Sequence, residues 1–150
     1  MNGYFDRTLV ADFPILYAQR DRPMNETCMC WGFEVGDGWE RIIRDLSQQL
    51  EFLNENTPVH VECLQCKEKF GELRFYTSGI EGGKFWADIV WALIDNAESR
   101  SAWTCERCGK WGKRRGEGWI VTLCDECDAE RHKASDQDVT QDSASVPTPG

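Results

Sequence analysis

Two Cys-x-x-Cys pairs constrain this chain more than any other feature of its sequence. The first pair is Cys105 and Cys108, and fifteen residues separate it from the second pair, Cys124 and Cys127. Each pair can present two thiolates from one tight turn, and two such turns complete a tetrahedral site with Zn–S bonds of ~2.3 Å. The spacing therefore predicts a Zn²⁺ site with four protein ligands. Such a site leaves no coordination position for water, which favours a structural role over a catalytic one.

Four more cysteines leave open a second metal site, formed by Cys28, Cys30, Cys63 and Cys66. Residues three apart on a regular strand point to opposite faces, so Cys63 and Cys66 would need a β-bulge or turn to share an ion. Buried free cysteine also behaves as a small hydrophobe, so the competing interpretation is that the four are core thiols. At the first site, iron with four thiolates is the alternative to zinc.

Composition places this chain among soluble folded proteins of reducing compartments. Of its 150 residues, 41% are hydrophobic, including seven Trp and seven Phe, which is enough to form a core. The net charge of −9 argues against a chain that coats nucleic acid or anionic membrane along its whole surface. The sequence shows no signal peptide and no apolar run near the ~18 residues of a membrane span. Eight cysteines without an export signal favour metal ligation in the cytoplasm over disulfides.

Hydrophobic periodicity predicts an α+β fold in which helices pack with a β-hairpin. Apolar residues at helical spacing predict a helix over 2–20 that is interrupted near Pro14, and further helices over 39–53 and 82–100. Asp37 is the expected cap of the second helix. Alternating residues over 59–78 predict the hairpin, with a type II′ turn at Gly71-Glu72. Residues 22–38 form an ordered loop.

This organisation divides the chain into three parts. Residues 1–100 form the α+β domain, and residues 101–129 form a small Cys₄ zinc-ribbon module. Residues 130–150 lose their aromatic side chains and are predicted to be a disordered acidic tail.

The segment between the two Cys pairs is a candidate nucleic-acid contact. Four basic residues and a tryptophan crowd into it: Lys110, Lys113, Arg114, Arg115 and Trp111. Such a patch can neutralise phosphates and stack bases. Residues 103–128 nevertheless carry five acidic side chains against five basic ones. The competing interpretation is that the basic residues cover the outer surface of a ribbon hairpin while Trp111 and Trp119 pack on the zinc turns.

Trp91 lies off the apolar stripe of its predicted helix and is a candidate anchor for a protein interface.

Catalytic motifs are missing from the sequence. His60-Val61-Glu62 resembles part of the zinc-deaminase signature, but Thr104 and Leu123 stand where that signature requires proline before each Cys pair. The sequence therefore predicts a protein without enzymatic activity.

Three segments occur in a fixed order: CMCWGFEVGDGW (28–39), QCKEKFGELRFY (65–76) and GWIVTLCDEC (118–127). That order resembles an uncharacterised family of small bacteriophage and prophage proteins, over roughly residues 12–128. The resemblance implies a phage or prophage origin and a bacterial host cytoplasm, but it implies no activity. The family usually has apolar residues at the positions of Cys63 and Cys66, which weakens a second metal site as a family feature.

Two functions remain as hypotheses. The first is a small zinc-binding protein without catalytic activity that acts by binding a host or phage protein, as a counter-defence or host-modulating factor. The alternative is a zinc-ribbon protein that binds nucleic acid through residues 110–119.

Overall fold

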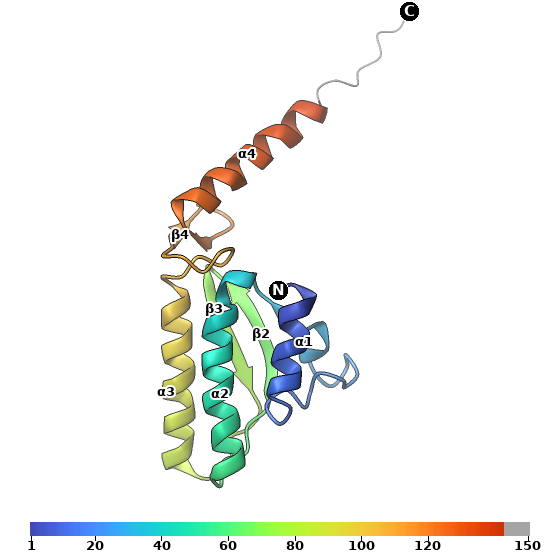
Figure 1. Ribbon diagram of the computed structural model, residues 1–150, viewed down its shortest axis with the longest axis vertical. Coiled ribbons are helices and arrows are strands. Elements are labelled where there is room, and N and C mark those ends of the chain that lie inside the picture. The colour runs from blue at the N-terminus through green and yellow to red at the C-terminus, as the bar shows by residue number, and fades with distance from the viewer. Residues whose placement is uncertain (143–150) are drawn as a thin grey trace, which may run out of the picture.

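The chain folds into a helical layer on one face of a small sheet, followed by a C-terminal extension (Figure 1). The computed structural model describes residues 1–142, with side chains through residue 133. The sheet has the order β1-β2-β3, where β1 (Phe33–Glu34) runs parallel to β2 (Cys63–Lys69) and β3 (Glu72–Thr77) runs antiparallel to it. Helices α2 (Glu40–Asn56) and α3 (Lys84–Ser101) lie side by side, with α1 (Gly3–Asp12) next to α2. The predicted α+β fold is thus confirmed.

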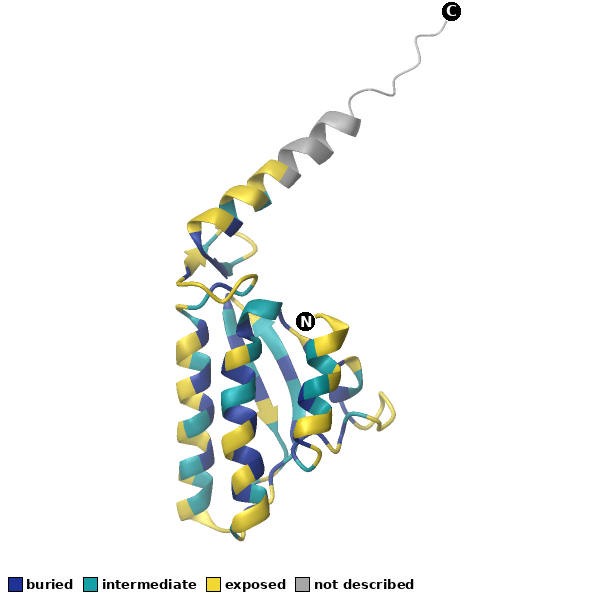
Figure 2. Cartoon of the chain, in the orientation of Figure 1, coloured by how far each residue is buried: buried dark blue, intermediate teal, exposed yellow. Residues whose placement is uncertain are grey.

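Helix α2 carries the centre of the core. Its apolar side chains recur at three- and four-residue spacing and are buried, as expected for a helix with one face on a sheet. They meet side chains from α1, α3 and the inner face of the sheet in one continuous cluster. Figure 2 shows the buried residues following this interface, while the outer faces of α2 and α3 are exposed.

The start of α2 differs from the sequence prediction. Asp37 does not cap the helix; it begins a 3₁₀ turn (Asp37–Trp39), and α2 begins at Glu40 without a side-chain cap. The Asp37 carboxylate instead accepts hydrogen bonds from the backbone and side-chain amides of Asn2, at 2.6 and 2.7 Å. The Asp37 carboxylate therefore bonds to a residue distant in the sequence and not to the backbone amides at the start of α2.

The hairpin turn also differs from the prediction. Lys69 pairs with Glu72, so the two turn residues are Phe70 and Gly71 rather than Gly71 and Glu72. Both have positive φ, +57° and +80°, which is the signature of a type I′ turn and not of type II′. A bulky residue at positive φ is uncommon. The sequence misled because a positive φ is expected at Gly71 and not at Phe70.

The C-terminal extension consists of a two-stranded hairpin and a helix. Strands β4 (Lys113–Arg115) and β5 (Val121–Leu123) pair antiparallel, and α4 (Asp125–Asp142) follows directly. Helix α4 thus continues into the segment that the sequence predicts to be disordered from residue 130, and residues 143–150 lie outside the described part. Three acidic residues in the first turn favour this helix because they complement its dipole. None of the described helices combines the length and apolar character that a membrane span needs.

Candidate metal centre

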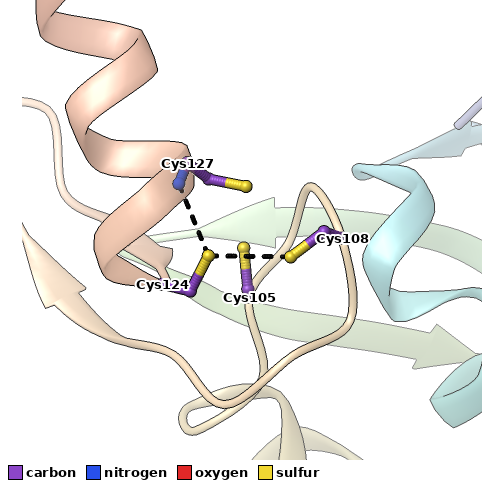
Figure 3. Close-up of side chains that lie close together, drawn as sticks. All are labelled: Cys105, Cys108, Cys124 and Cys127. Atoms are coloured by element: carbon purple, nitrogen blue, oxygen red, sulfur yellow. Dashed lines mark hydrogen bonds between the residues drawn. The ribbon is translucent and has the colours of Figure 1, made fainter.

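The first Cys pair lies on a tight turn that follows α3. The Gly109 N–H donates to the Cys105 carbonyl at 2.9 Å, and the Cys105 N–H donates to the Lys110 carbonyl at 2.7 Å. Gly109 closes this turn with φ of +75°, a conformation that glycine adopts without strain. The resulting knuckle points the thiols of Cys105 and Cys108 to the same side (Figure 3).

The second Cys pair lies at the junction of β5 and α4. Cys124 directly precedes the helix and Cys127 belongs to its first turn. The Cys127 N–H is 3.4 Å from the Cys124 Sγ, so a free helix amide donates to that sulfur. Helix N-termini stabilise thiolates through such amides and through the helix dipole. The fold therefore favours the thiolate form of Cys124.

The four sulfur atoms form a group with the dimensions of a tetrahedral metal site. All four lie within 4.8 Å of one another, and the Sγ atoms of Cys108 and Cys124 are 3.6 Å apart (Figure 3). A tetrahedron with Zn–S bonds of ~2.3 Å has edges of about 3.8 Å, so the observed spacing fits without rearrangement of the backbone. Cys105, Cys124 and Cys127 are buried, whereas Cys108 is exposed. These four residues can hold a metal ion.

The thiols differ in how readily they lose a proton. The hydrogen bond from the Cys127 N–H is the main cause that lowers the pKa of the Cys124 thiol to about 7. Burial, with the neighbouring thiols, raises the pKa of Cys127, and burial also raises the pKa of Cys108. A cation at the centre would offset the effect of burial on these thiols, because metal binding deprotonates a coordinating thiol. Cys124 thus reaches its thiolate form more readily than Cys108 or Cys127.

The first knuckle packs tightly on the segment that precedes α2. The Gly38 N–H donates to the Glu106 carbonyl at 2.7 Å, and the Gly36 N–H donates to the Glu106 carboxylate at 2.9 Å. A Cβ on Gly38 would lie 2.1 Å from the Cys105 carbonyl oxygen, so only glycine fits there. The buried Trp39 donates its indole N–H to the Thr104 carbonyl at 2.7 Å. Sequence reasoning missed this contact, although the string GDGW was visible.

The ribbon hairpin makes a second contact, with the type I′ turn. The buried Thr122 hydroxyl donates to the Gly71 carbonyl at 2.6 Å, and the Arg114 guanidinium donates to the Phe70 carbonyl at 2.9 Å. Both turn carbonyls are therefore engaged by the segment that lies between the Cys pairs. This holds the C-terminal module against the sheet as well as against α2.

The structure does not bring the other four cysteines together at the distances of one metal site. Within residues 1–133, only the C-terminal cysteines form a group of three or more potential ligands at binding distance. A β-bulge between Cys63 and Gln65 does place Cys63 and Cys66 together on the buried face of β2, as a shared ion would need. Cys28, however, is exposed, and the Cys63 thiol lies 3.6 Å from the Met29 sulfur. Burial raises the pKa of Cys63 and of Cys66, so both behave as apolar core residues.

Each basic residue of the candidate nucleic-acid contact has a carboxylate partner. Lys110 meets Glu126 at 2.6 Å, Lys113 meets Asp125 at 3.4 Å, and Arg114 meets Glu72 at 3.6 Å. Arg115 pairs with Asp125 and with Asp128. The positive charge of this loop is therefore offset locally.

The tryptophans of the C-terminal module are mostly exposed. The expectation that Trp111 and Trp119 pack on the zinc turns is wrong, because 72% and 77% of their surfaces are accessible. Trp111 instead stacks on Trp103, with ring centroids 5.3 Å apart and an angle of 20° between the planes. The knuckle fixes this pair, since Gly112 N–H donates to the Trp103 carbonyl at 2.8 Å. Trp91 on α3 is 48% exposed, in keeping with its position off the apolar stripe.

Comparison of this chain with protein-family models, with curated proteins and with solved structures finds no significant match. The relation to phage and prophage proteins therefore stays a prediction from the three sequence segments.

Proposed function

We propose that this chain is a binding protein without enzymatic activity, in which a structural Zn²⁺ holds the C-terminal module and the protein acts by contact with another protein. The observation that carries this proposal is the closed ligand set: four cysteine sulfurs within 4.8 Å of one another, all from the protein. Zn²⁺ favours this tetrahedral thiolate set, and four-cysteine zinc sites are structural.

The surroundings of the four cysteines support a structural role. The two ligand pairs come from segments that the fold brings together: the knuckle after α3 and the start of α4. The same knuckle holds Gly36, Gly38 and Trp39 through hydrogen bonds. An ion here would lock the module and its contacts in place, and structural zinc contributes folding free energy of on the order of 10 kcal/mol.

Exposed tryptophans of the C-terminal module favour a protein partner. Trp103, Trp111 and Trp119 are each more than half exposed, and aromatic side chains of this kind are enriched at the centres of protein interfaces. Nucleic acid is the weaker candidate because the four basic residues between the Cys pairs already have carboxylate partners. A phosphate would have to displace those carboxylates before it gained a contact.

The phage and prophage resemblance supplies the setting for the proposal, a bacterial host cytoplasm with a host or phage protein as partner. Affinity capture from such cells, with and without nuclease, tests it. We expect a protein that survives nuclease treatment and is lost with Trp103→Ser together with Trp111→Ser. Phe52→Ser is the matched control, because Phe52 is an equally exposed aromatic residue on α2. Capture that disappears on nuclease treatment would instead favour the nucleic-acid alternative.

A further inference from the structure

A groove of about 480 Å³ lies between α3 and the outer strand β3. Glu72 and Arg74 of β3 form one wall, Asp95 and Glu98 of α3 form the other, and Trp103 closes the end. Trp91 precedes Asp95 by one helical turn on α3, so the two side chains lie on the same side of the helix. The groove thus lies beside the α3 face that carries Trp91, and Trp103, just after the helix, closes its end.

Two contacts order the aromatic end of the groove. Trp103 is 56% exposed, and its ring stacks on that of Trp111. The Gly112 N–H also donates to the Trp103 carbonyl, which joins the two segments that carry the stacked rings. A preorganised indole face attracts cations through its ring quadrupole.

Carboxylates outnumber cations in this groove. Arg74 is shared between Glu72 at 2.8 Å and Glu98 at 3.4 Å, and Glu72 also meets Arg114 at 3.6 Å. Asp95 is exposed and has no ion-pair or hydrogen-bond partner among the described residues. Three carboxylates therefore face two guanidinium groups, and the unpaired one lies between Trp91 and Trp103 along α3.

The open edge of β3 cannot accept an extra strand from a partner. Its outward N–H groups at Leu73 and Phe75 donate to the Ser101 hydroxyl at 2.8 Å and to the Glu98 carboxylate at 3.0 Å. With these donors occupied, a peptide in the groove must be recognised by its side chains and not by β-augmentation.

We propose that this groove binds a basic segment of a partner protein, with a Lys or Arg side chain on the exposed face of Trp103 and its charge toward Asp95. The proposal rests on the proposed function, for which it names the chemistry of the partner. Charge complementarity supports a basic partner, because the chain carries −9 overall and the groove has an uncompensated carboxylate. The same net charge disfavours a second copy of this chain as the occupant.

The test measures binding of a fluorescein-labelled peptide of alternating Lys and Ala to the zinc-loaded full chain by fluorescence anisotropy. The comparison probes are a labelled peptide of alternating Glu and Ala, of the same length, and a labelled single-stranded oligonucleotide. We expect only the Lys peptide to bind, with affinity that falls as salt rises. Asp95→Asn should weaken it by about threefold to fivefold, and Trp103→Leu by at least as much.

Glu55→Gln is the matched control, since it removes the same charge from an exposed site on α2 and should leave binding unchanged. Zinc content and circular dichroism of each variant show whether it is folded. Because Asp95 is exposed, Asp95→Asn should fold and keep the test valid even if Trp103→Leu does not fold. Equal binding of wild type and Asp95→Asn, or a Glu peptide or oligonucleotide that binds as well as the Lys peptide, would overturn the proposal. Zinc stoichiometry and Trp103-dependent capture of a partner would still stand in that case, so the two failures are distinguishable.

Discussion

The two parts of this molecule are built on different sources of stability. From α1 to α3, apolar side chains of three helices and a sheet form one large buried cluster. The C-terminal module has a cluster of four buried residues, Cys105, Leu123, Cys124 and Cys127, of which three are candidate metal ligands. Small modules without an adequate core commonly depend on metal or disulfides. The comparison predicts that the module depends on a metal ion for its stability, whereas the part from α1 to α3 does not.

The two parts are nevertheless joined by specific contacts. Gly38 and Trp39 hydrogen-bond to the backbone at the first knuckle, and the hairpin-turn carbonyls accept from Arg114 and Thr122. The larger part thus presents a preformed surface on which the knuckle folds. Loss of the ion should therefore unfold the module first, and a substitution that disrupts this surface should weaken metal binding.

Removal of two ligands is expected to have the largest effect. With Cys105→Ser and Cys108→Ser, the module should lose its zinc. It should also lose the folding free energy that structural zinc contributes, on the order of 10 kcal/mol. Limited proteolysis should then cut the chain beyond residue 101 while the part from α1 to α3 stays protected. Cys28→Ser, at an exposed cysteine outside the group, is the control and should keep both zinc and protection. A double variant that remained resistant throughout would show that the module does not need the ion.

Gly38→Ala tests whether the surface before α2 positions the knuckle. The new Cβ would lie 2.1 Å from the Cys105 carbonyl oxygen and 2.5 Å from the Gly109 nitrogen, both backbone atoms that cannot move aside easily. We expect a loss of about 2–4 kcal/mol in the free energy of unfolding, and weaker zinc retention in competition with a chelator. Gly79→Ala is the control, because nothing lies within 4 Å of a Cβ there. Equal behaviour of the two variants would contradict a tight contact at Gly38.

Cys63→Ser separates a core thiol from a metal ligand. Cys63 is fully buried next to Met29, so the more polar hydroxyl should lower the free energy of unfolding by about 1–2 kcal/mol, measured by urea denaturation. Elemental analysis should show an unchanged zinc content. A loss of one zinc equivalent with this variant would reveal a second metal site.

Glu106→Gln should produce the smallest effect and one that depends on pH. Burial raises the pKa of Glu106 above its ordinary value of 4.5, although the Gly36 N–H works in the opposite direction. The folded state therefore favours the protonated form, so the cost of the charge is absent below pH 4.5 and grows as pH rises through the folded pKa. Glutamine keeps an oxygen for Gly36 and carries no charge. The stability of the variant relative to wild type, from urea unfolding with zinc present, should be higher at pH 7 than at pH 5. The opposite trend would contradict a half-buried carboxylate whose charged form costs stability.

The sequence was sufficient for features that depend on local patterns. The period of Ile42, Ile43, Leu46 and Leu50 defined α2, and the spacing of the Cys pairs defined the group that the structure brings together. The sequence was insufficient where contacts with residues distant in the chain determine the local structure. Asp37 was assigned to the helix cap because its partner Asn2 lies 35 residues away, and the turn was misplaced because the carbonyls of Phe70 and Gly71 are held from the C-terminal module.

The metal site shows the same division. Cysteine spacing identifies the ligands, but only the fold reveals that Gly36, Gly38 and Trp39 support the first knuckle. The carboxylate partners of the basic loop come from β3 and from the first turn of α4, so only the fold shows which charges pair. The charge of that loop could therefore not be judged from its own residues.

Native mass spectrometry of the intact protein, purified without added metal, tests the central claim most directly. One Zn²⁺ should be bound per chain, and its removal by a strong chelator should expose the region beyond residue 101 to protease while α1 to α3 remain protected. A chain that carries no metal and still resists protease throughout, or one that binds iron in place of zinc, would contradict the claim that a structural Zn²⁺ at Cys105, Cys108, Cys124 and Cys127 holds the module together.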